Sequence, residues 1–228
     1  MPNIVPGVYG EVEIIFEPER QAYFLYHNGI GWMQTDKDFT HPKDTFYSQY
    51  DLAYGNVLLT GLGFGILPIA LAQKENVSSV TVLELNSDVE KAFLESNPEN
   101  HKIKIISGDA TTYETDVKYD CFLPDHYELQ PDSWKLMDMS KIFKRIKTET
   151  YWPWSIEGLF LKKEFPKNDS EFLLEEYLNT NRHKVGKRWR EFLLKNFIDH
   201  PSLTTIEDEK LALYLCKWSG YHQSLKNS

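Results

Sequence analysis

Cysteine is scarce in this chain of 228 residues, and long hydrophobic runs are missing. The two cysteines, Cys121 and Cys216, lie in apolar segments and predict reduced core residues rather than a disulfide framework. No apolar segment approaches the ~20 residues that a membrane-spanning helix needs. The opening segment MPNIVPGVYGEVE has neither a basic start nor a long apolar region, so we expect no signal peptide and a cytoplasmic location.

Positive charge is also in short supply. Lysine and arginine number 25 against 34 aspartates and glutamates, which gives a formal net charge of -9 and argues against general binding to nucleic acid or membrane surfaces. The segment Arg182–Arg190, RHKVGKRWR, is a basic exception. Contact with nucleic acid is one interpretation of it, but we favour a solvated helix face with Trp189 turned inward. The seven histidines show no metal-ligand spacing, so no metal is predicted.

Residues 1–50 predict a small antiparallel β-hairpin region. Val12–Phe16 and Ala22–His27 are rich in β-branched and aromatic residues, and Asn28-Gly29 is a hairpin-turn signal. A loop that enters a helix follows. We expect this region to precede a second unit over residues 51–228.

From residue 56 onward, short apolar runs alternate with amphipathic ones. NVLLTG, SVTVLEL, KIKIISGDA and YDCFLPDHY predict strands, while ILPIALAQKE and SDVEKAFLES, with Ser87 or Asp88 as its N-cap, predict helices. This rhythm predicts an α/β fold, a Rossmann-like, mostly parallel sheet flanked by helices. Further along, GLFLKKEF and KLALYLCKW predict two more strands. WKLMDMSKIFKRIK and a long stretch around Gly186, where we expect a break, predict helices.

Three glycines, Gly61, Gly63 and Gly65, stand between the first strand of this unit and the helix after it. Glycine permits a tight turn with positive φ and lets a ligand approach the backbone. The helix start that follows offers unpaired N–H groups and a partial positive charge. A tight strand–helix turn would explain the glycines as well, so they do not identify a ligand alone.

Two further strand ends strengthen the case for a nucleotide site. Glu84 ends the second strand about 20 residues beyond the glycines, which suits a carboxylate that accepts hydrogen bonds from a ribose diol. Asp109 ends the third strand, where it would accept the exocyclic amine of adenine, and Ala110 leaves room for the base. Each acid has a plainer explanation as a strand end or loop cap. Together with the glycines they favour an adenosyl pocket at the carboxyl edge of the sheet.

The motifs VLLTGLGFG, VLELN, GDATTY and YDCFLPD resemble those of the class I S-adenosylmethionine-dependent methyltransferases. Among these the chain is most similar to the spermidine synthase (aminopropyltransferase) branch. Leu59 stands where many methyltransferases carry an acid, and YHNGIGWMQTDKDF resembles the hairpin of the synthases, which implies a pocket role for Gln34. The match of YDCFLPD implies that Asp125 is an active-site base or amine anchor. His126 and Tyr127 beside it are further catalytic candidates.

This resemblance implies S-adenosylmethionine, or its decarboxylated form, as cofactor. The loop that follows the aspartate in the synthases is replaced here by HYELQPDSW, so the resemblance covers the nucleoside pocket and not the polyamine pocket. We therefore expect methyl transfer to a small-molecule acceptor. Aminopropyl transfer and a non-catalytic adenosyl-nucleoside-binding domain are the alternatives, and a homodimer is compatible with each.

Overall fold

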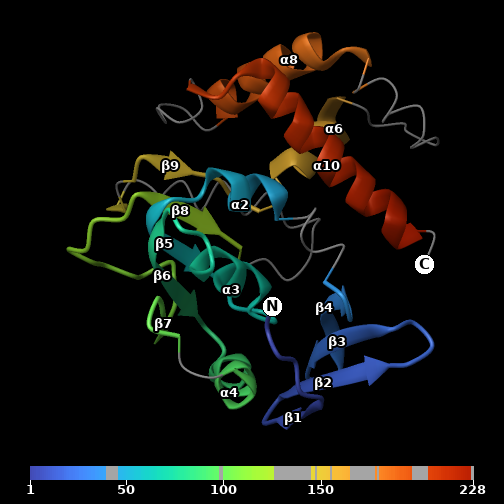
Figure 1. Ribbon diagram of the computed structural model, residues 1–228, viewed down its shortest axis with the longest axis vertical. Coiled ribbons are helices and arrows are strands. Elements are labelled where there is room, and N and C mark those ends of the chain that lie inside the picture. The colour runs from blue at the N-terminus through green and yellow to red at the C-terminus, as the bar shows by residue number, and fades with distance from the viewer. Residues whose placement is uncertain are drawn as a thin grey trace.

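The computed structural model describes residues 1–39, 46–97, 100–125, 145–146, 148–154, 156–164, 178, 180–196 and 205–226. Two sheets and several helices make up this described part (Figure 1). None of the helices in these ranges is long and apolar enough to cross a membrane.

The first sheet is an antiparallel meander with the strand order β1-β2-β3-β4. Its strands are β1 (Gly7–Tyr9), β2 (Val12–Glu17), β3 (Ala22–His27) and β4 (Ile30–Asp36). The predicted turn joins β3 to β4, with positive φ at Asn28 and Gly29. The pairing of β3 with β4 passes from Leu25–Met33 to Tyr26–Gly31, so Trp32 is an extra residue in a β-bulge.

The second sheet has the order β7-β6-β5-β8-β9, and each neighbouring pair is parallel. Its strands are β5 (Gly55–Thr60), β6 (Val77–Glu84), β7 (Ile103–Ser107), β8 (Cys121–Pro124) and β9 (Thr150–Tyr151). This order confirms the predicted Rossmann-like α/β architecture. The chain reverses its direction of travel between β5 and β8, which is the position where open α/β sheets bind ligands.

Burial on both faces explains why β5 is a continuous apolar run. Val57 and Leu59 belong to the main core, whereas Leu58 packs into a second cluster with Leu83 and Phe122 on the other side of the sheet.

Helices α2 (Tyr47–Leu52), α3 (Ile66–Ala72) and α4 (Ser87–Ser96) connect or cover these strands. α3 begins after Gly65, and Pro68 lies in its first turn, where a missing N–H is tolerated. α4 is capped by Asn86, not by Ser87 or Asp88 as expected. The Asn86 Oδ1 atom accepts the N–H of Asp88 at 2.9 Å.

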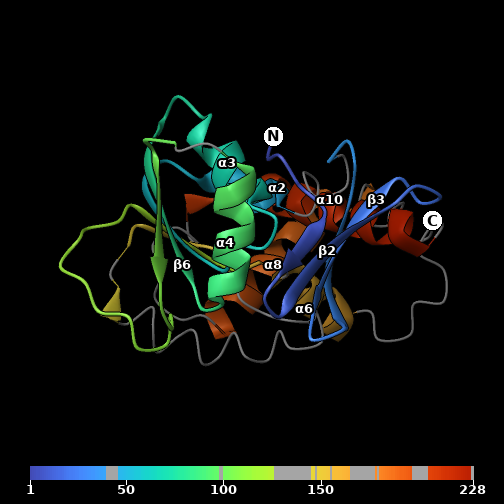
Figure 2. The same ribbon diagram turned by 90° about the horizontal axis from the view of Figure 1, so that it is seen from below.

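The chain preceding the first sheet, and the turn after β1, hold α4 at both of its ends. At its C-terminal end, Asn3 N–H donates to Asn97 Oδ1 (2.8 Å), Asn97 Nδ2 donates to Asn3 O (3.0 Å), and Asn3 Nδ2 donates to Ser96 O (3.0 Å). At its N-terminal end, Glu11 N–H donates to Asp88 Oδ2 at 2.9 Å. We call these contacts the α4 clamp. Figure 2 shows α4 between β6 and the first sheet.

The C-terminal part contains α6 (Ile156–Glu164), α8 (Arg182–Asn196) and α10 (Asp208–Lys226). The strands predicted at GLFLKKEF and KLALYLCKW are wrong, because Gly158–Glu164 of the first segment lies in α6 and the second segment lies in α10. Short apolar runs do not distinguish a buried strand from a buried helix. The helices pack around an aromatic cluster in which Trp189 contacts Trp152 and Phe160, and Trp152 contacts Tyr214.

α8 runs unbroken through Gly186, contrary to expectation. A Cβ atom at Gly186 would clash with the backbone of Asp208, so glycine allows α8 and α10 to approach closely. Trp189 is fully buried, as predicted, while Lys184 and Lys187 on the same helix are exposed. The helix predicted at WKLMDMSKIFKRIK lies almost wholly outside the described residues.

Candidate functional site

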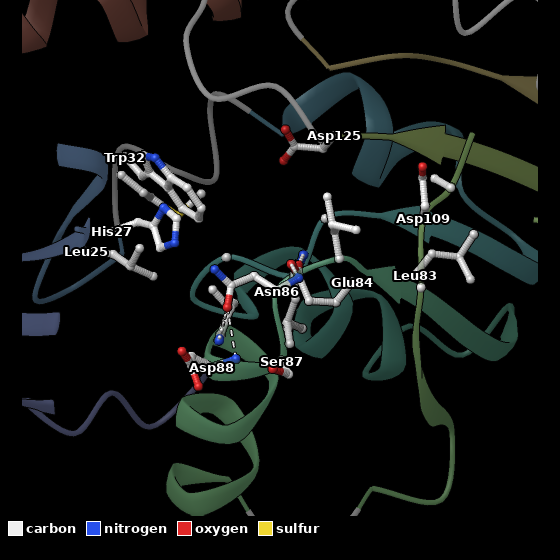
Figure 3. Close-up of a pocket in the computed structure, with 18 of the residues that line it drawn as sticks. Leu25, His27, Trp32, Leu83, Glu84, Asn86, Ser87, Asp88, Asp109 and Asp125 are labelled. Carbon is white, nitrogen blue, oxygen red and sulfur yellow. Dashed lines mark hydrogen bonds between the residues drawn. The ribbon is translucent and has the colours of Figure 1, made fainter. Parts of the chain in front are cut away.

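A pocket of about 550 Å³ lies between the carboxyl edge of the parallel sheet and the first sheet (Figure 3). Residues at or just beyond the carboxyl ends of β5, β6, β7 and β8 line one side of it: Gly61–Gly63, Leu83–Val89, Gly108–Ala110 and Asp125. The first sheet and the turn before β2 supply Glu11, Leu25, His27, Trp32 and Met33. The pocket therefore occupies the position that the strand order predicts.

The glycines of this loop have two different roles. Gly61 and Gly63 line the pocket with positive φ of 84° and 50°, and a Cβ atom at Gly63 would lie 2.7 Å from the Cε atom of Met33. Gly65 is not among the lining residues. It has φ of 74°, and a side chain there would collide with Phe93 of α4. Gly65 thus serves helix packing, whereas the other two shape the cavity wall.

Glu84 lines the pocket and also joins two of its walls. Its side chain is only 8% exposed, and its Oε2 and Oε1 atoms accept the N–H groups of Leu62 (2.7 Å) and Asn86 (2.8 Å). A carboxylate has about four lone-pair sites, so two bonds to the backbone leave capacity for a ligand. Burial raises the pKa of Glu84, while the backbone N–H groups oppose that rise.

Asp109 and Ala110 lie together at the end of β7. Asp109 is exposed at the pocket and stabilises its own loop, because its Oδ1 atom accepts the N–H of Thr111 at 2.7 Å. Ala110 is buried and lines the pocket beside it. The loop cap and the predicted base contact are thus compatible at this position.

Asp125 follows β8, and its carboxylate points into the pocket (Figure 3). Its N–H donates to the carbonyl (2.8 Å) and hydroxyl (3.2 Å) oxygens of buried Thr60, which fixes its position. Burial raises the pKa of Asp125 to about 7, and the charge of Glu84 contributes to that rise. This carboxyl group is suited to exchange a proton near neutral pH. His126 and Tyr127 lie outside the described residues.

Gln34 does not lie where the resemblance implied. Its side chain is exposed and is not among the described pocket residues, whereas Trp32 and Met33 of the same strand are. The bulge at Trp32 explains the difference, because an extra residue lets two consecutive side chains face one side and shifts those that follow.

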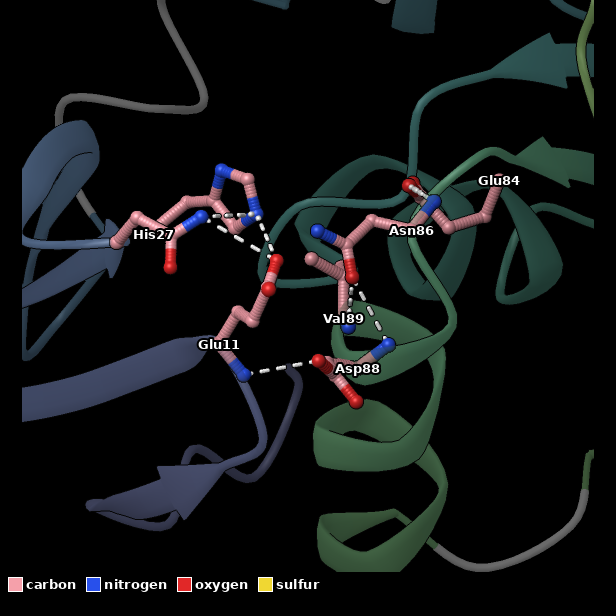
Figure 4. A network of polar contacts seen from close by, with 7 residues as sticks. Glu11, His27, Glu84, Asn86, Asp88 and Val89 are labelled. Atoms are coloured by element: carbon pink, nitrogen blue, oxygen red, sulfur yellow. Dashed lines mark hydrogen bonds and ion pairs between the residues drawn. The ribbon is translucent and has the colours of Figure 1, made fainter.

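A polar network on the first sheet was not anticipated from the sequence (Figure 4). His27 Nε2 lies 3.2 Å from Glu11 Oε2, and Asn28 Nδ2 donates to the same oxygen at 3.2 Å. The His27 ring packs on Trp32 with 4.2 Å between ring centroids. Leu25 and His27 alternate along β3 and share a face, but only the tertiary arrangement shows that this face meets the pocket.

The described lining is strongly acidic. Five carboxylates contribute to it, and neither lysine nor arginine does: Glu11, Glu84, Asp88, Asp109 and Asp125. In a partly enclosed site such a lining favours a cationic ligand. Within the described ranges, no three His, Cys, Asp or Glu side chains are grouped so as to hold a metal ion.

No family model and no curated protein sequence matches the chain. Solved structures do resemble it. A spermidine synthase in complex with the transition state analogue AdoDATO is 13% identical to this chain, with a TM-score of 0.46. The match covers 65% of this chain and 54% of the synthase. The Thermotoga maritima spermidine synthase has 15% identity, a TM-score of 0.45, and coverage of 64% and 54%. A putative S-adenosylmethionine-dependent methyltransferase from Methanococcus maripaludis has 16% identity, a TM-score of 0.40, and coverage of 69% and 74%. The chain thus spans about half the length of these two synthases.

Proposed function

We propose that this protein is an S-adenosylmethionine-dependent methyltransferase that acts on a small-molecule acceptor. The observation that supports this most is the joint placement of Glu84 and the Gly61–Gly63 loop around one pocket at the switch point of the sheet. A carboxylate and a close-approach backbone at these two strand ends suit a ribose and the chain attached to it.

Each part of the pocket has a distinct task in this proposal. The Glu84 carboxylate accepts hydrogen bonds from the ribose hydroxyls, and the Asp109 carboxylate accepts one from the adenine amine. Gly61 and Gly63 leave room for the rest of the ligand. The cofactor supplies a methyl group already activated by a positively charged sulfur. The acidic lining stabilises that charge.

Asp125 is the proton-transfer group of the proposed mechanism. Thr60 fixes its backbone, so the carboxylate is held at the end of β8 facing the cavity. With a pKa near 7 it takes up the proton that an amine or hydroxyl acceptor loses during transfer. The protein contributes mainly by holding the acceptor in line with the methyl group.

Aminopropyl transfer from decarboxylated S-adenosylmethionine is the second candidate, and one observation favours it. The decarboxylated cofactor lacks the carboxylate of S-adenosylmethionine, and the described lining has five acids without a lysine or arginine to receive one. The same lining suits the additional amine of an aminopropyl acceptor.

Calorimetry with S-adenosylmethionine, its decarboxylated form and methylthioadenosine tests both candidates. Tighter binding of S-adenosylmethionine supports methyl transfer, and tighter binding of the decarboxylated form supports aminopropyl transfer. A screen of small amines, polyamines and nucleic acids with labelled cofactor then identifies the acceptor. If none of the three adenosyl compounds binds, the proposal fails; if cofactor is consumed without any acceptor, a lyase or hydrolase activity replaces it.

A further inference from the structure

We propose that His27 is the specificity residue for the tail of the ligand, and that it pairs with the carboxylate that distinguishes S-adenosylmethionine from its decarboxylated form. This inference rests on the proposed function, because it assumes that an adenosyl ligand occupies the pocket. His27 belongs to the first sheet and lies outside the motifs at the strand ends of the parallel sheet.

The two sides of the pocket divide the ligand between them. Three groups are suited to the nucleoside: Glu84 ends β6, and Asp109 and Ala110 follow β7. His27 stands on the opposite wall, and Figure 3 shows its ring directed from the first sheet toward the cavity. A ligand whose ribose is held by Glu84 and whose base lies at β7 extends its tail toward the glycine loop and this wall.

Met33 marks where the wall and the loop meet. It belongs to β4, lines the pocket beside Trp32, and its Cε atom occupies the space next to Gly63. We therefore place the tail of the ligand beside this junction of the glycine loop and the first sheet. His27 lines the pocket on the same side as Met33, so we place the end of the tail at His27.

Charge singles out His27 within this wall. It is the one side chain in the described lining that can carry a positive charge, among five carboxylates. A ligand carboxylate would meet repulsion from those acids unless an imidazolium offset it. The other ionisable lining residues are all acidic and cannot take this role.

The surroundings of His27 prepare it for that role. Glu11 Oε2 lies 3.2 Å from Nε2, so this carboxylate engages that nitrogen and leaves Nδ1 to the ligand. A protonated imidazole donates from both nitrogens, so Glu11 and the ligand carboxylate occupy one each. Trp32 packs on the ring and fixes its plane, and the side chain of His27 retains 24% exposure.

The test compares the affinities of three probes for the full-length protein by calorimetry. The probes are S-adenosylmethionine, decarboxylated S-adenosylmethionine and methylthioadenosine, and the variants are His27→Gln and His27→Lys. His101→Gln is the matched control, because His101 is exposed and is not among the described pocket residues. Thermal unfolding of each variant shows that it is folded.

In His27→Gln, we expect the affinity for S-adenosylmethionine to fall roughly ten- to hundredfold, as for the loss of a charge-assisted hydrogen bond. Binding of the other two probes should not change. His27→Lys should retain the preference for S-adenosylmethionine, which also guards against a merely structural effect of the glutamine. Equal losses for all three probes, or no loss for S-adenosylmethionine, would overturn the role of His27 while the adenosyl site stands. Failure of the unaltered protein to bind any probe would instead refute the proposed function.

Discussion

Replacing Glu84 with alanine should impair both the fold and the binding of an adenosyl ligand. The substitution removes a buried carboxylate that accepts two backbone hydrogen bonds, from Leu62 at 2.7 Å and Asn86 at 2.8 Å. Hydrogen bonds to a charged group contribute about 1.5–3 kcal/mol each, and the burial of the charge offsets part of that gain. We therefore expect the free energy of unfolding to fall by about 2–4 kcal/mol, because the buried N–H of Leu62 and the half-buried N–H of Asn86 lose their partner.

The effect on binding should be separable from the effect on stability. Loss of the ribose contact alone should weaken S-adenosylmethionine binding roughly ten- to hundredfold. Glu84→Gln keeps one carbonyl oxygen but turns an NH₂ group toward the second backbone donor, so it should fall between alanine and the native residue in both measurements. Urea unfolding gives the stability, and calorimetry under conditions where each variant is folded gives the affinity.

Glu95→Ala provides the control for this experiment. Glu95 is an exposed acid on α4 that pairs with Lys91 at 3.8 Å, and such surface pairs contribute about 0–1 kcal/mol. An alanine variant at Glu84 that is as stable as the Glu95 control would refute the role of the Glu84 carboxylate in holding the two backbone segments. Unchanged affinity for S-adenosylmethionine in a folded Glu84 variant would remove Glu84 from the ribose site.

Three other substitutions test separate parts of the structure. Gly63→Val places a side chain at positive φ and against Met33. Calorimetry should then detect no binding of an adenosyl ligand, while circular dichroism should show that most of the fold is intact. Retained binding would mean that this glycine serves only the turn. Asp125→Asn should bind cofactor nearly normally but lose most turnover. In the native protein the rate should rise as pH increases through about 7, because the carboxylate is the reactive form. A variant that keeps its turnover and only melts at a lower temperature would indicate that Asp125 is a loop cap instead. Burial raises the pKa of Glu157 from 4.5 to about 7, so the stability it contributes is fully present below about pH 4.5 and is lost progressively as pH rises to about 7, by roughly 3 kcal/mol. Urea unfolding at pH 5 and pH 8 should show a smaller difference in Glu157→Gln than in the native protein, and an equal difference would place the titrating group elsewhere.

The sequence was sufficient to predict the parts of the fold that depend on local pattern. Strands that are buried on both faces appear in the sequence as continuous apolar runs. The Asn28-Gly29 turn and the turn from strand through glycines to helix also have local sequence signals, so both sheets were predicted. The C-terminal strands were mispredicted because α6 and α10 are buried around the aromatic cluster, and their apolar residues show no clear helical face. Packing among distant segments decided those elements.

The candidate site divides in the same way. Glu84, Asp109 and Asp125 end successive strands of a parallel sheet, so their shared edge follows from topology. Gln34 was misplaced because a single extra residue at Trp32 changes which side chains face the pocket. Glu11 and His27 were missed because their contact with the pocket depends on how the first sheet docks on α4, and no local pattern encodes that docking.

The α4 clamp connects the two walls of the pocket. α4 follows β6, whose end forms part of one wall of the pocket. The same helix holds Asn3 and Glu11, which flank the first strand of the sheet that forms the opposite wall. Rotation of the first sheet away from the parallel sheet would break the hydrogen bonds of Asn3 and Glu11 together. We therefore expect the two walls to stay together while a ligand binds and leaves, because opening by a hinge would cost both sets of hydrogen bonds. Amide hydrogens of the clamp should accordingly exchange no faster when the pocket is empty than when it is filled.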